Sequence, residues 1–514
     1  MDKRLKTFAM YLPQFYRIPE NDKWWGEGFS DWVTLKNSDS LFEGHNQPRI
    51  PLDSNYYDLS DINVIRWQAK IAKQYGIDGF CMYHYYFENG RKVLEKPAQN
   101  LLSDKNIDIE YCFCWANETW ARSWTKLYHA NSWSVKNEIR TEDESEILLK
   151  QDYGNETEWR KHFEYLLPFF KDERYIKKDN KPIFLVYLPD DIPMYHEMFL
   201  CFDKWCKEED FAGIYSIGAN VTYPISGMDA IVYIHIRNDL LGLPTDIEIK
   251  NGVRIREYEE VWNKMLSLPC VDMIKTYFGG FVDRDDTPRH GARGMCITGG
   301  NPHTFEDKLF KLAVKNIHYD NEYMFIDAWN EWGEGCYLEP DEINKFGYLE
   351  SVSSVMSKVN ASDFDNEKEW EKLNLEEKSF AENSDFQRNL NKYQSYYRVL
   401  DLWLKINEQG KNLADYFYKN SYRSILIYGY TSLADHLINA LKGSDVKVLG
   451  YIDRRDDYRA EKLPVFNLES QFPICDAIVV TPIYDFTKIH DSLVQKSNSQ
   501  IVSIEEIIMC IGID

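Results

Sequence analysis

Short apolar runs recur through the first two thirds of the chain, and helical or polar stretches separate them. Runs that are apolar at nearly every position are typical of parallel strands buried on both faces. Eight such runs predict strands at residues 7–15, 79–87, 109–117, 182–189, 214–221, 230–236, 274–282 and 323–332. Helical periodicity predicts helices at residues 61–75, 156–170, 193–208, 255–267 and 303–318. Asp61 and Thr304 are candidate N-caps, and Gly76 follows the first helix as a terminating glycine would.

Eight strands with interleaved helices predict an α/β fold, a (β/α)8 TIM barrel that occupies residues 1–355. One connection departs from this pattern, because no helix fits between Val221 and Ala230. Two long insertions, at about residues 16–60 and 118–155, follow the first and third strands. In a barrel of this kind they form long active-face loops.

A second unit is expected after the barrel. Residues 356–420 are rich in charge and predict a helical linker, with an amphipathic helix over 397–418. Residues 421–514 alternate between strand and helix patterns, which predicts a small C-terminal Rossmann-like, doubly wound α/β domain. Its strands are expected at residues 423–429, 446–453, 476–482 and 500–504, and its helices at 432–442 and 485–496.

The first turn of this second unit carries a weak nucleotide-binding signal. Gly429 begins the turn, and Asp453 ends the second strand, where an acid that binds a ribose would lie. Thr431 replaces the second glycine of the dinucleotide fingerprint, where the backbone must approach a pyrophosphate. The alternatives are a nucleotide site and a degenerate module used for packing or partner contact.

Composition narrows the class of protein. The net charge of −23 disfavours a nucleic-acid partner, because phosphate backbones require clustered Lys and Arg. Ten cysteines without a C-x-x-C pair, including Cys112 and Cys114, are expected to be reduced core thiols in a cytoplasmic protein. We expect no signal peptide, no membrane span and no metal site, since no apolar run is long enough and no His/Asp cluster has ligand spacing.

Aromatic residues are abundant and mix with polar ones. The chain has 35 Tyr, 27 Phe and 15 Trp, many in clusters such as WWGEGFSDW (24–32) and MYHYYF (82–87). Sugars stack their C–H faces on rings and bind fixed polar groups through their hydroxyls, so this mixture suits a carbohydrate site. Polar or aromatic residues also mark nearly every predicted strand end: Gln14, His84, Asn117, Glu118, Tyr187, Asn220, His235, Asp283, Asn330 and Glu331.

The stretch DAWNEWGEG (327–335) carries the candidate catalytic groups. Two carboxylates near one cleft are the minimum requirement for glycosidic-bond chemistry. Glu331 and Glu334 would point to opposite faces of a continuing strand, but Gly333 and Gly335 permit a turn that brings both to one cleft. Spacing alone leaves open whether their separation suits inversion or retention.

Five segments in order resemble the WbsX family: AMYLPQFYRIPENDKWWGEGFSDW, YGIDGFCMYHYYFENGRKVLEKP, CFCWANETWARSW, RHGARG and AWNEWGEGCYLEPD. That family is labelled glycosyltransferase and is related to glycoside hydrolase family 99, the endo-α-mannosidases and endo-mannanases. The resemblance covers about residues 5–355 and implies a (β/α)8 barrel without a cofactor. It implies that Glu331 takes the proton of a sugar 2-hydroxyl, which attacks the anomeric carbon with overall retention. It implies that Glu334 is the general acid and base, for which its pKa must be raised.

The remaining candidates are substrate contacts. They are Trp24, Trp25, Tyr83, His84, Tyr85, Trp115, Asn117, Glu118, Trp120, Tyr187, Asn220, His235, Arg289, His290 and Asn330. Strand alternation allows only one of two sets, His84 or its neighbours Tyr83 and Tyr85, to face the cleft. Arg289 and His290 either contact an acidic sugar or phosphate or pair with carboxylates. Asp327 is expected to be structural, and Tyr337 and Glu339 to support the catalytic pair.

Three functions stay open on these grounds. The first is hydrolysis or transglycosylation of a bacterial oligosaccharide or polysaccharide through Glu331 and Glu334. The second is a glycosyltransferase of surface polysaccharide (O-antigen or capsule) biosynthesis that uses a nucleotide sugar. The nearest match to a metal-binding Asp-x-Asp is Asp283-Arg284-Asp285-Asp286, which weakens metal-dependent binding of the donor and leaves metal-independent transferases open. The third is a non-catalytic glycan-binding protein, whose mark would be a lost carboxylate.

Overall fold

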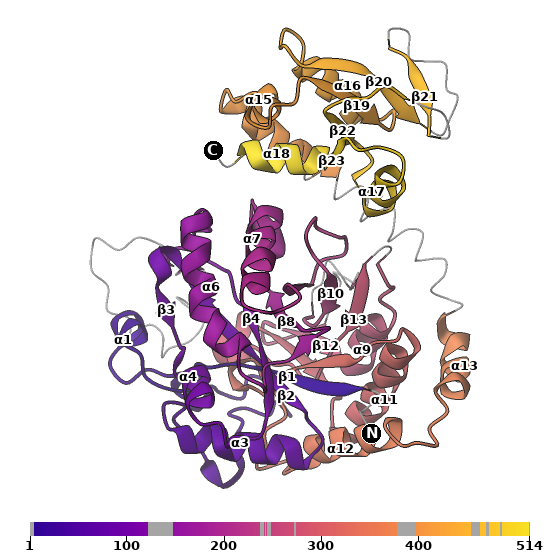
Figure 1. The fold of residues 1–514 in the computed structure, drawn as a ribbon. Coiled ribbons are helices and arrows are strands. Elements are labelled where there is room, and N and C mark those ends of the chain that lie inside the picture. The colour runs from indigo at the N-terminus through magenta and orange to yellow at the C-terminus, as the bar shows by residue number, and fades with distance from the viewer. Residues whose placement is uncertain are drawn as a thin grey trace.

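A closed ring of eight parallel strands forms the centre of the larger unit in the computed structural model (Figure 1). The structure describes residues 5–121, 147–236, 241, 243, 248–271, 274–377, 396–397, 399–453, 463–468, 472–483 and 486–512. In ring order, the strands are β1 (Lys6–Tyr11), β2 (Gly79–Tyr86), β4 (Glu110–Trp115), β8 (Lys181–Val186), β9 (Tyr215–Ala219), β10 (Ala230–Tyr233), β13 (Lys275–Phe278) with β14 (Gly280–Phe281), and β16 (Tyr323–Asp327). Each overlaps one predicted apolar run, so the (β/α)8 barrel is confirmed.

The ring closes at a break in its seventh strand. β13 pairs with β10, and β14 pairs with β16, which in turn pairs with β1. Gly279 lies between the two halves and donates its N–H to the Tyr233 carbonyl at 2.7 Å. A Cβ at Gly279 would lie 2.5 Å from the Tyr233 oxygen and 2.9 Å from the Phe325 oxygen. A glycine therefore lets the strand change neighbours where the barrel closes.

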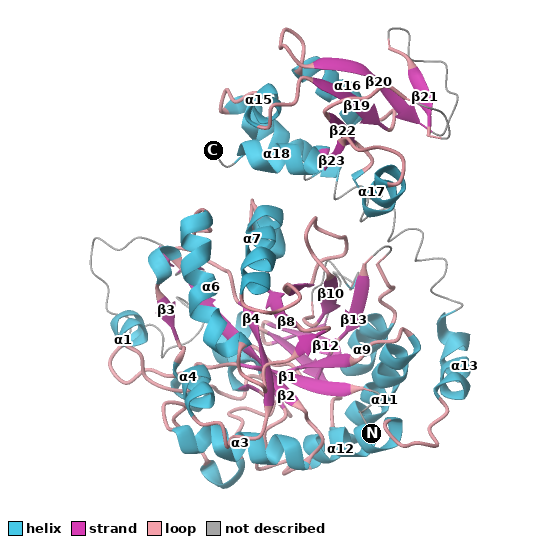
Figure 2. Cartoon of the chain, in the orientation of Figure 1, coloured by secondary structure: helices cyan, strands magenta, loops and turns pink. Residues whose placement is uncertain are grey.

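Helices surround the ring (Figure 2). They include α3 (Ile62–Gln74), α4 (Lys96–Ser103), α6 (Glu156–Phe170), α7 (Tyr195–Glu208), α9 (Tyr258–Leu266), α11 (Pro302–His318) and α12 (Gly347–Val359). Asp61 caps α3 as predicted, by accepting from the Asn63 N–H. The prediction for Thr304 is wrong: Asn301 caps α11, and the Thr304 side chain accepts from the Asn301 N–H to complete a capping box.

A small sheet outside the ring was not predicted. It contains β11 (Glu248–Lys250), β12 (Val253–Glu257) and β15 (Met295–Thr298). The predicted helix 255–267 therefore begins later, at Tyr258, because its first residues belong to β12. The sheet packs against Leu41 and Phe42 of the first long insertion and so holds that loop beside the barrel.

The C-terminal residues build a separate five-stranded parallel sheet with its own apolar core. The strand order is β21 (Val465–Asn467), β20 (Lys447–Asp453), β19 (Ser424–Tyr428), β22 (Ala477–Val480) and β23 (Gln500–Ser503), with helices α16 (Ser432–Ala440), α17 (Phe486–Val494) and α18 (Ile504–Gly512). Strand β21 and helix α18 were not predicted. The predicted helix 397–418 is interrupted at residues 409–413, after which α15 (Ala414–Lys419) begins.

The predicted linker is helical at α13 (Asn366–Glu377), while its residues 378–395 and 398 lie outside the described residues, as do 122–146 of the second long insertion. In the part of the chain that the structure describes, no helix has both the length and the apolar character needed to cross a bilayer.

Replacing Gly279 with Ala is expected to lower the free energy of unfolding by about 1–3 kcal/mol, because the added methyl group overlaps two carbonyl oxygens. Urea denaturation followed by tryptophan fluorescence measures this change. Ser357→Ala, at an exposed position of α12, is the control and should stay within about 0.5 kcal/mol of the wild type. Equal stability of the two variants would contradict the closure argument.

Candidate active site

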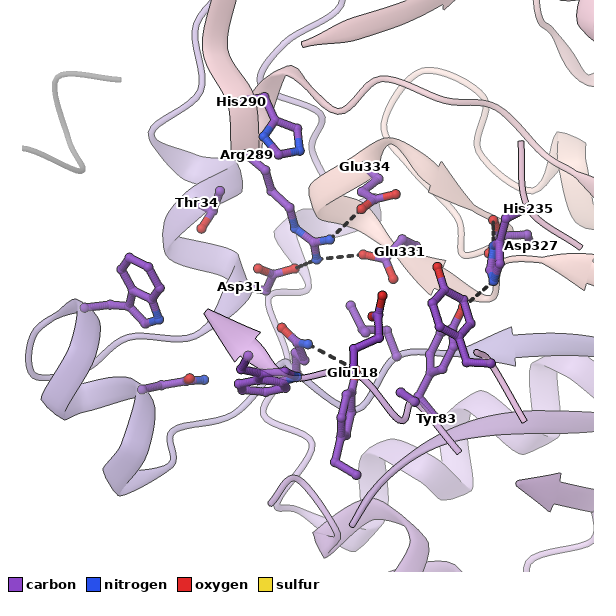
Figure 3. Close-up of a pocket in the computed structure, with 18 of the residues that line it drawn as sticks. Asp31, Thr34, Tyr83, Glu118, His235, Arg289, His290, Asp327, Glu331 and Glu334 are labelled. Carbon is purple, nitrogen blue, oxygen red and sulfur yellow. Dashed lines mark hydrogen bonds and ion pairs between the residues drawn. The ribbon is translucent and has the colours of Figure 1, made fainter. Parts of the chain in front are cut away.

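One cavity of about 550 Å³ opens where the carboxyl ends of the barrel strands meet the long loops (Figure 3). Its lining comes from the ends of barrel strands, from both long insertions and from the loops after the seventh and eighth strands. The residues are Leu12, Gln14, Asn21, Trp24, Trp25, Phe29, Asp31, Thr34, Tyr83, Tyr85, Ala116, Glu118, Trp120, Leu148, Tyr187, His235, Ile236, Arg284, Arg289, His290, Asp327, Glu331 and Glu334.

A tight turn brings Glu331 and Glu334 to the same cavity. Glu331 ends the short strand β17 (Asn330–Glu331), and residues Trp332–Glu334 form one 3-10 turn that Gly335 closes with φ 65°. Gly333 is needed for space as well, since a Cβ there would lie 2.7 Å from Arg289 Nε and 2.8 Å from Asp31 Oδ2. The turn therefore pairs the two carboxylates and leaves room for a cation beside them.

Arg289 is that cation. Its Nη1 lies 2.8 Å from Glu334 Oε1, and its Nη2 lies 2.7 Å from Glu331 Oε1 and 2.6 Å from Asp31 Oδ2. Asp31 begins helix α2 (Asp31–Lys36) in the first long insertion, and Arg289 lies in α10 (Thr287–His290). Arg284 adds a second cation, with Nη2 at 2.8 Å from Glu334 Oε2. Of the two predicted roles for Arg289, the structure shows pairing with carboxylates.

The two glutamates have opposite electrostatic surroundings. Burial raises the pKa of Glu331 well above its usual value, and Arg289 offsets this only in part. Burial also acts to raise the pKa of Glu334, but the charges of Arg284 and Arg289 outweigh it and hold that pKa at about 2. In the substrate-free site, burial therefore favours the protonated form at Glu331, while the two arginines favour the ionised form at Glu334. The expectation of a raised pKa at Glu334 is wrong for this state.

Glu118 is a third carboxyl group of the cavity. It points towards Glu331 and Glu334 from the facing wall (Figure 3). Burial, followed by the negative charges of Asp191 and Glu334, raises its pKa to about 8. It is therefore a neutral acid near neutral pH and can donate a hydrogen bond to a sugar oxygen.

His235 connects two further residues at the cavity wall. Its Nδ1 lies 3.1 Å from Asp327 Oδ2, and its Nε2 lies 3.2 Å from the Tyr83 hydroxyl. The ring of Tyr187 approaches His235 edge-on, with centroids 5.1 Å apart. Asp327 was expected to be structural, but it lines the cavity and contacts the cavity-lining His235.

The structure brings ten of the fifteen predicted substrate contacts to the cavity together with Glu331 and Glu334. These ten are Trp24, Trp25, Tyr83, Tyr85, Glu118, Trp120, Tyr187, His235, Arg289 and His290. The other five, His84, Trp115, Asn117, Asn220 and Asn330, do not line it.

His84 and Trp115 lie on the outer side of the ring, beneath helix α6. His84 Nε2 lies 2.9 Å from Nε2 of His162, which belongs to α6. Trp115 donates its Nε1–H to the Tyr86 carbonyl at 3.1 Å and contacts the His162 ring edge-on. Of the two sets that strand alternation left open, Tyr83 and Tyr85 face the cavity, and the assignment of His84 to the substrate is corrected.

The three asparagines hydrogen-bond to the backbone. Asn330 accepts from the Leu12 N–H at 2.8 Å and donates to the Leu12 carbonyl at 3.0 Å. Asn117 makes the same pair of contacts with Leu188, at 2.8 and 2.7 Å. Asn220 Oδ1 accepts from the N–H groups of Ile234 and His235. Each asparagine amide hydrogen-bonds to backbone groups of a segment that leaves a strand. These predicted hydroxyl contacts are therefore corrected.

Sequence reasoning missed Asp31, Arg284 and the cavity position of Asp327. Asp31 lies inside the aromatic cluster 24–32, and Arg284 inside 283–286, so both stood in stretches already singled out. Their partners are distant in sequence, and only the fold brings them together. Glu339 supports the turn as expected, accepting from Tyr57, Gln68 and Trp332, and Tyr337 stacks on Trp332 at 3.7 Å.

A buried His45–Asp285–Cys296 cluster is the one grouping with metal-ligand character among the described residues. His45 Nδ1 accepts from the Leu41 N–H at 3.0 Å, so its Nε2 carries the proton that is donated to Asp285 at 2.8 Å. Both ring nitrogens are therefore engaged within the protein. Asp283 is similarly paired with Arg49 at 2.9 Å.

Side chains in and beside the turn after β19 hydrogen-bond to the backbone of the turn and of helix α16. Asp453 accepts from the Tyr430 N–H at 2.9 Å, and Thr431 caps α16 by accepting from the Ala434 N–H. A Cβ at Gly429 would lie 2.6 Å from Pro482. Gly429 therefore has a packing role, and Asp453 has a backbone partner.

A profile of the family described as "Glycosyltransferase WbsX" matches residues 7–352. The chain belongs to this family. "Uncharacterized protein WxcX" of Xanthomonas campestris pv. campestris, in each of two strains, is 29% identical over 365 residues, which cover 68% of this chain and 49% of the relative. This WbsX-family chain thus spans about half the length of the curated relatives it matches.

Solved structures similar to this WbsX-family chain include the GH99 endo-alpha-mannosidase from Bacteroides thetaiotaomicron, with 13% identity, a TM-score of 0.42, and coverage of 70% of this chain and 98% of that one. A "Glycoside hydrolase-like protein" has 11% identity and a TM-score of 0.42, covering 69% and 94%. The likeness is weak, and the barrel assignment depends on the strand pairing described above.

Burial lowers the pKa of His84 to about 3 and that of His162 well below its usual value. Unfolded histidines bind protons below about pH 6.5 while these two stay neutral, so stability is expected to fall as the pH drops from about 6.5 towards 3. His84→Leu should reduce the slope of unfolding free energy against pH by about 1.4 kcal/mol per pH unit. The exposed His303→Gln is the control. An unchanged slope in His84→Leu would contradict a buried neutral His84.

Proposed function

We propose that the barrel is a carbohydrate-active enzyme that cleaves or transfers a glycosidic bond of a bacterial polysaccharide, with Glu331 and Glu334 as its proton-transfer pair. One observation carries this proposal: two glutamates three positions apart face one cavity, joined through Arg289 and walled by aromatic rings. Paired carboxylates that share the environment of a cleft are what glycosidic-bond chemistry requires.

The family resemblance assigns the roles, and we propose a retaining reaction on that basis. Glu331 takes the proton of the sugar 2-hydroxyl, whose oxygen forms a bond to the anomeric carbon as the bond to the leaving oxygen breaks. Glu334 gives its proton to the leaving oxygen. Water or a sugar hydroxyl then adds to the anomeric carbon as the bond from that carbon to the 2-oxygen breaks. Glu334 takes the proton of the nucleophile, and Glu331 returns its proton to the 2-oxygen.

The substrate-free protonation state has the correct number of protons for these roles but the opposite arrangement. The reaction begins with Glu331 ionised and Glu334 protonated, whereas burial and the two arginines favour the reverse. One proton moving from Glu331 to Glu334 when a sugar enters corrects this without changing the charge of the site. Arg289 contacts both carboxylates, so any shift of its guanidinium changes their relative pKa values.

A glycosyltransferase that uses a nucleotide sugar is the second candidate, and the family description favours it. The geometry favours a neutral sugar instead. Arg289 and Arg284, the two arginines of the cavity lining, are already paired with Asp31, Glu331 and Glu334. A diphosphate would have to displace those carboxylates and bring its own negative charge beside them.

We propose the following organisation around this site. Residues 1–355 form the catalytic domain, 356–420 a charged linker, and 421–514 a Rossmann-like doubly wound domain in a cytoplasmic protein that needs no cofactor. Support for the last domain comes from its strand order, with β19 at the centre and two strands on each side, which is a doubly wound arrangement.

Glu331→Gln and Glu334→Gln are each expected to lose about 10²–10⁴-fold in kcat/KM, because each removes one proton-transfer group and keeps the side-chain shape. The assay measures new reducing ends from a panel of bacterial polysaccharides without nucleotide sugar, and in parallel transfer from nucleotide sugars. Glu350→Gln, exposed on α12, is the control. Full activity in either cavity variant would contradict the mechanism, and activity only with nucleotide sugars would favour the second candidate.

Arg289→Gln is expected to move the acid limb of the pH profile of kcat/KM to higher pH by about 1–3 units. The lost guanidinium had favoured the ionised form of both glutamates, so both pKa values rise without it. Arg289→Lys keeps a positive charge at this position, so its acid limb should move less than that of Arg289→Gln. Arg293→Gln changes an exposed arginine of the same loop and is the matched control. An acid limb that stays in place in Arg289→Gln would refute the electrostatic role of Arg289.

A further inference from the structure

A chain of three side chains runs along the cavity wall from Asp327 through His235 to Tyr83 (Figure 3). Asp327 ends β16, His235 follows β10, and Tyr83 lies in β2, so three separate barrel strands contribute to it. The side chains of His235 and Asp327 are 12% and 6% exposed. All three residues line the cavity that holds Glu331 and Glu334.

The direction of the hydrogen bonds in this chain follows from donor and acceptor chemistry. The Asp327 carboxylate can only accept, so His235 Nδ1 carries the hydrogen of the 3.1 Å contact. In neutral imidazole the other nitrogen is then an acceptor, and Tyr83 must donate across the 3.2 Å contact. Burial, followed by the charge of Asp327, raises the pKa of Tyr83 well above its usual value, so the phenol keeps the proton that it donates.

His235 has little freedom to reverse this order. Its backbone N–H donates to Asn220 Oδ1 at 3.1 Å, which fixes the main chain after β10. The Tyr187 ring packs edge-on against the imidazole at 5.1 Å. A histidine that is held by a carboxylate on one nitrogen keeps one tautomer and one ring orientation.

We propose that Asp327, acting through His235, commits the Tyr83 hydroxyl to be a hydrogen-bond acceptor towards the cavity, so that Tyr83 selects a sugar carrying a free hydroxyl at the facing position. With its one hydrogen given to His235, the phenol oxygen presents only lone pairs to a ligand. Sugars with hydrogen, O-methyl or O-acetyl at that position have nothing to donate and leave a buried acceptor unpaired. The substrate part of this inference rests on the proposed function; the hydrogen-bond order does not.

The hydrogen-bond order is tested on the full chain by nitrogen-15 NMR of labelled histidine, with the His235 signals assigned by their loss in His235→Gln. The wild type should show protonated Nδ1 and unprotonated Nε2. Asp327→Asn should shift the population towards protonated Nε2, since an amide can donate to Nδ1. A wild-type His235 with Nε2 protonated near neutral pH would overturn the proposal, because Tyr83 would then be free to donate.

The selectivity is tested with neutral aldohexoses and their monodeoxy analogues as probes, using saturation-transfer NMR. For a hexose that binds the wild type, one deoxy analogue should bind about tenfold to a hundredfold more weakly. Tyr83→Phe should bind that hexose and its analogue about equally, while Tyr56→Phe, at a tyrosine that does not line the cavity, should keep the discrimination.

The outcomes separate the two proposals. Discrimination that survives in Tyr83→Phe, or its absence in the wild type, overturns the selectivity while the proposed function stands. If no hexose binds at all, the proposed function and the hydroxyl contact fail together, and the histidine signals still decide the hydrogen-bond order.

Discussion

The contact of Arg289 with Asp31, Glu331 and Glu334 is the interaction on which the rest of the site depends. Ionised carboxylates are costly to bury unless a cation or hydrogen bonds compensate them. Here one guanidinium joins three segments that are distant in sequence: the first long insertion, the loop after the seventh strand and the turn after the eighth. Gly333 leaves space for this cation. The geometry of the glutamate pair and the position of the first insertion are therefore set by the same contact.

The cavity contains two regions that differ in charge and in hydrogen bonding. Glu331, Glu334, Asp31, Arg284 and Arg289 form one region, whose charges balance when Glu331 holds a proton. Asp327, His235 and Tyr83 form a second region, in which hydrogen-bond direction is fixed and no net charge is offered by the phenol. Under the proposed function, a substitution in one region can change proton transfer without changing hydroxyl recognition in the other. Aromatic rings between and around these regions provide faces on which sugar rings can stack.

The barrel was predictable because its signal is dense and local. Each of the eight strands is a nearly continuous apolar run, and such runs are typical of parallel strands whatever their neighbours. The turn at Gly333 and the pair it serves were also visible, since both lie within nine residues. By contrast, Thr304 and Asn301 are equally plausible caps, and only the backbone geometry at Asn301 decides between them. The pattern of residues 397–418 did not indicate the interruption at 409–413.

Side-chain roles at strand ends were harder to predict, for two physical reasons. Alternation separates His84 from Tyr83 and Tyr85 but does not say which face lies inside the ring. Polar residues at strand ends also include those that satisfy the departing backbone, as Asn117, Asn220 and Asn330 do, and these resemble ligand contacts in sequence. Asp31 and Arg284 acquire their meaning only from partners far along the chain. The protonation of Glu334 likewise depends on cations that the fold delivers.

We infer that the buried glutamate pair holds one proton, on Glu331, because burial favours the acid form there while Arg289 and Arg284 keep Glu334 ionised. Infrared difference spectra between the wild type and each glutamine variant, near neutral pH and without substrate, test it most directly. All spectra are recorded in a Glu118→Gln background, because the charge of Glu334 raises the pKa of Glu118 and the protonation of Glu118 would otherwise change with the variant. Glu331→Gln is expected to remove a protonated-carboxyl stretch, and Glu334→Gln is expected to remove a carboxylate stretch. Loss of the protonated-carboxyl band in Glu334→Gln, with the band intact in Glu331→Gln, would contradict it.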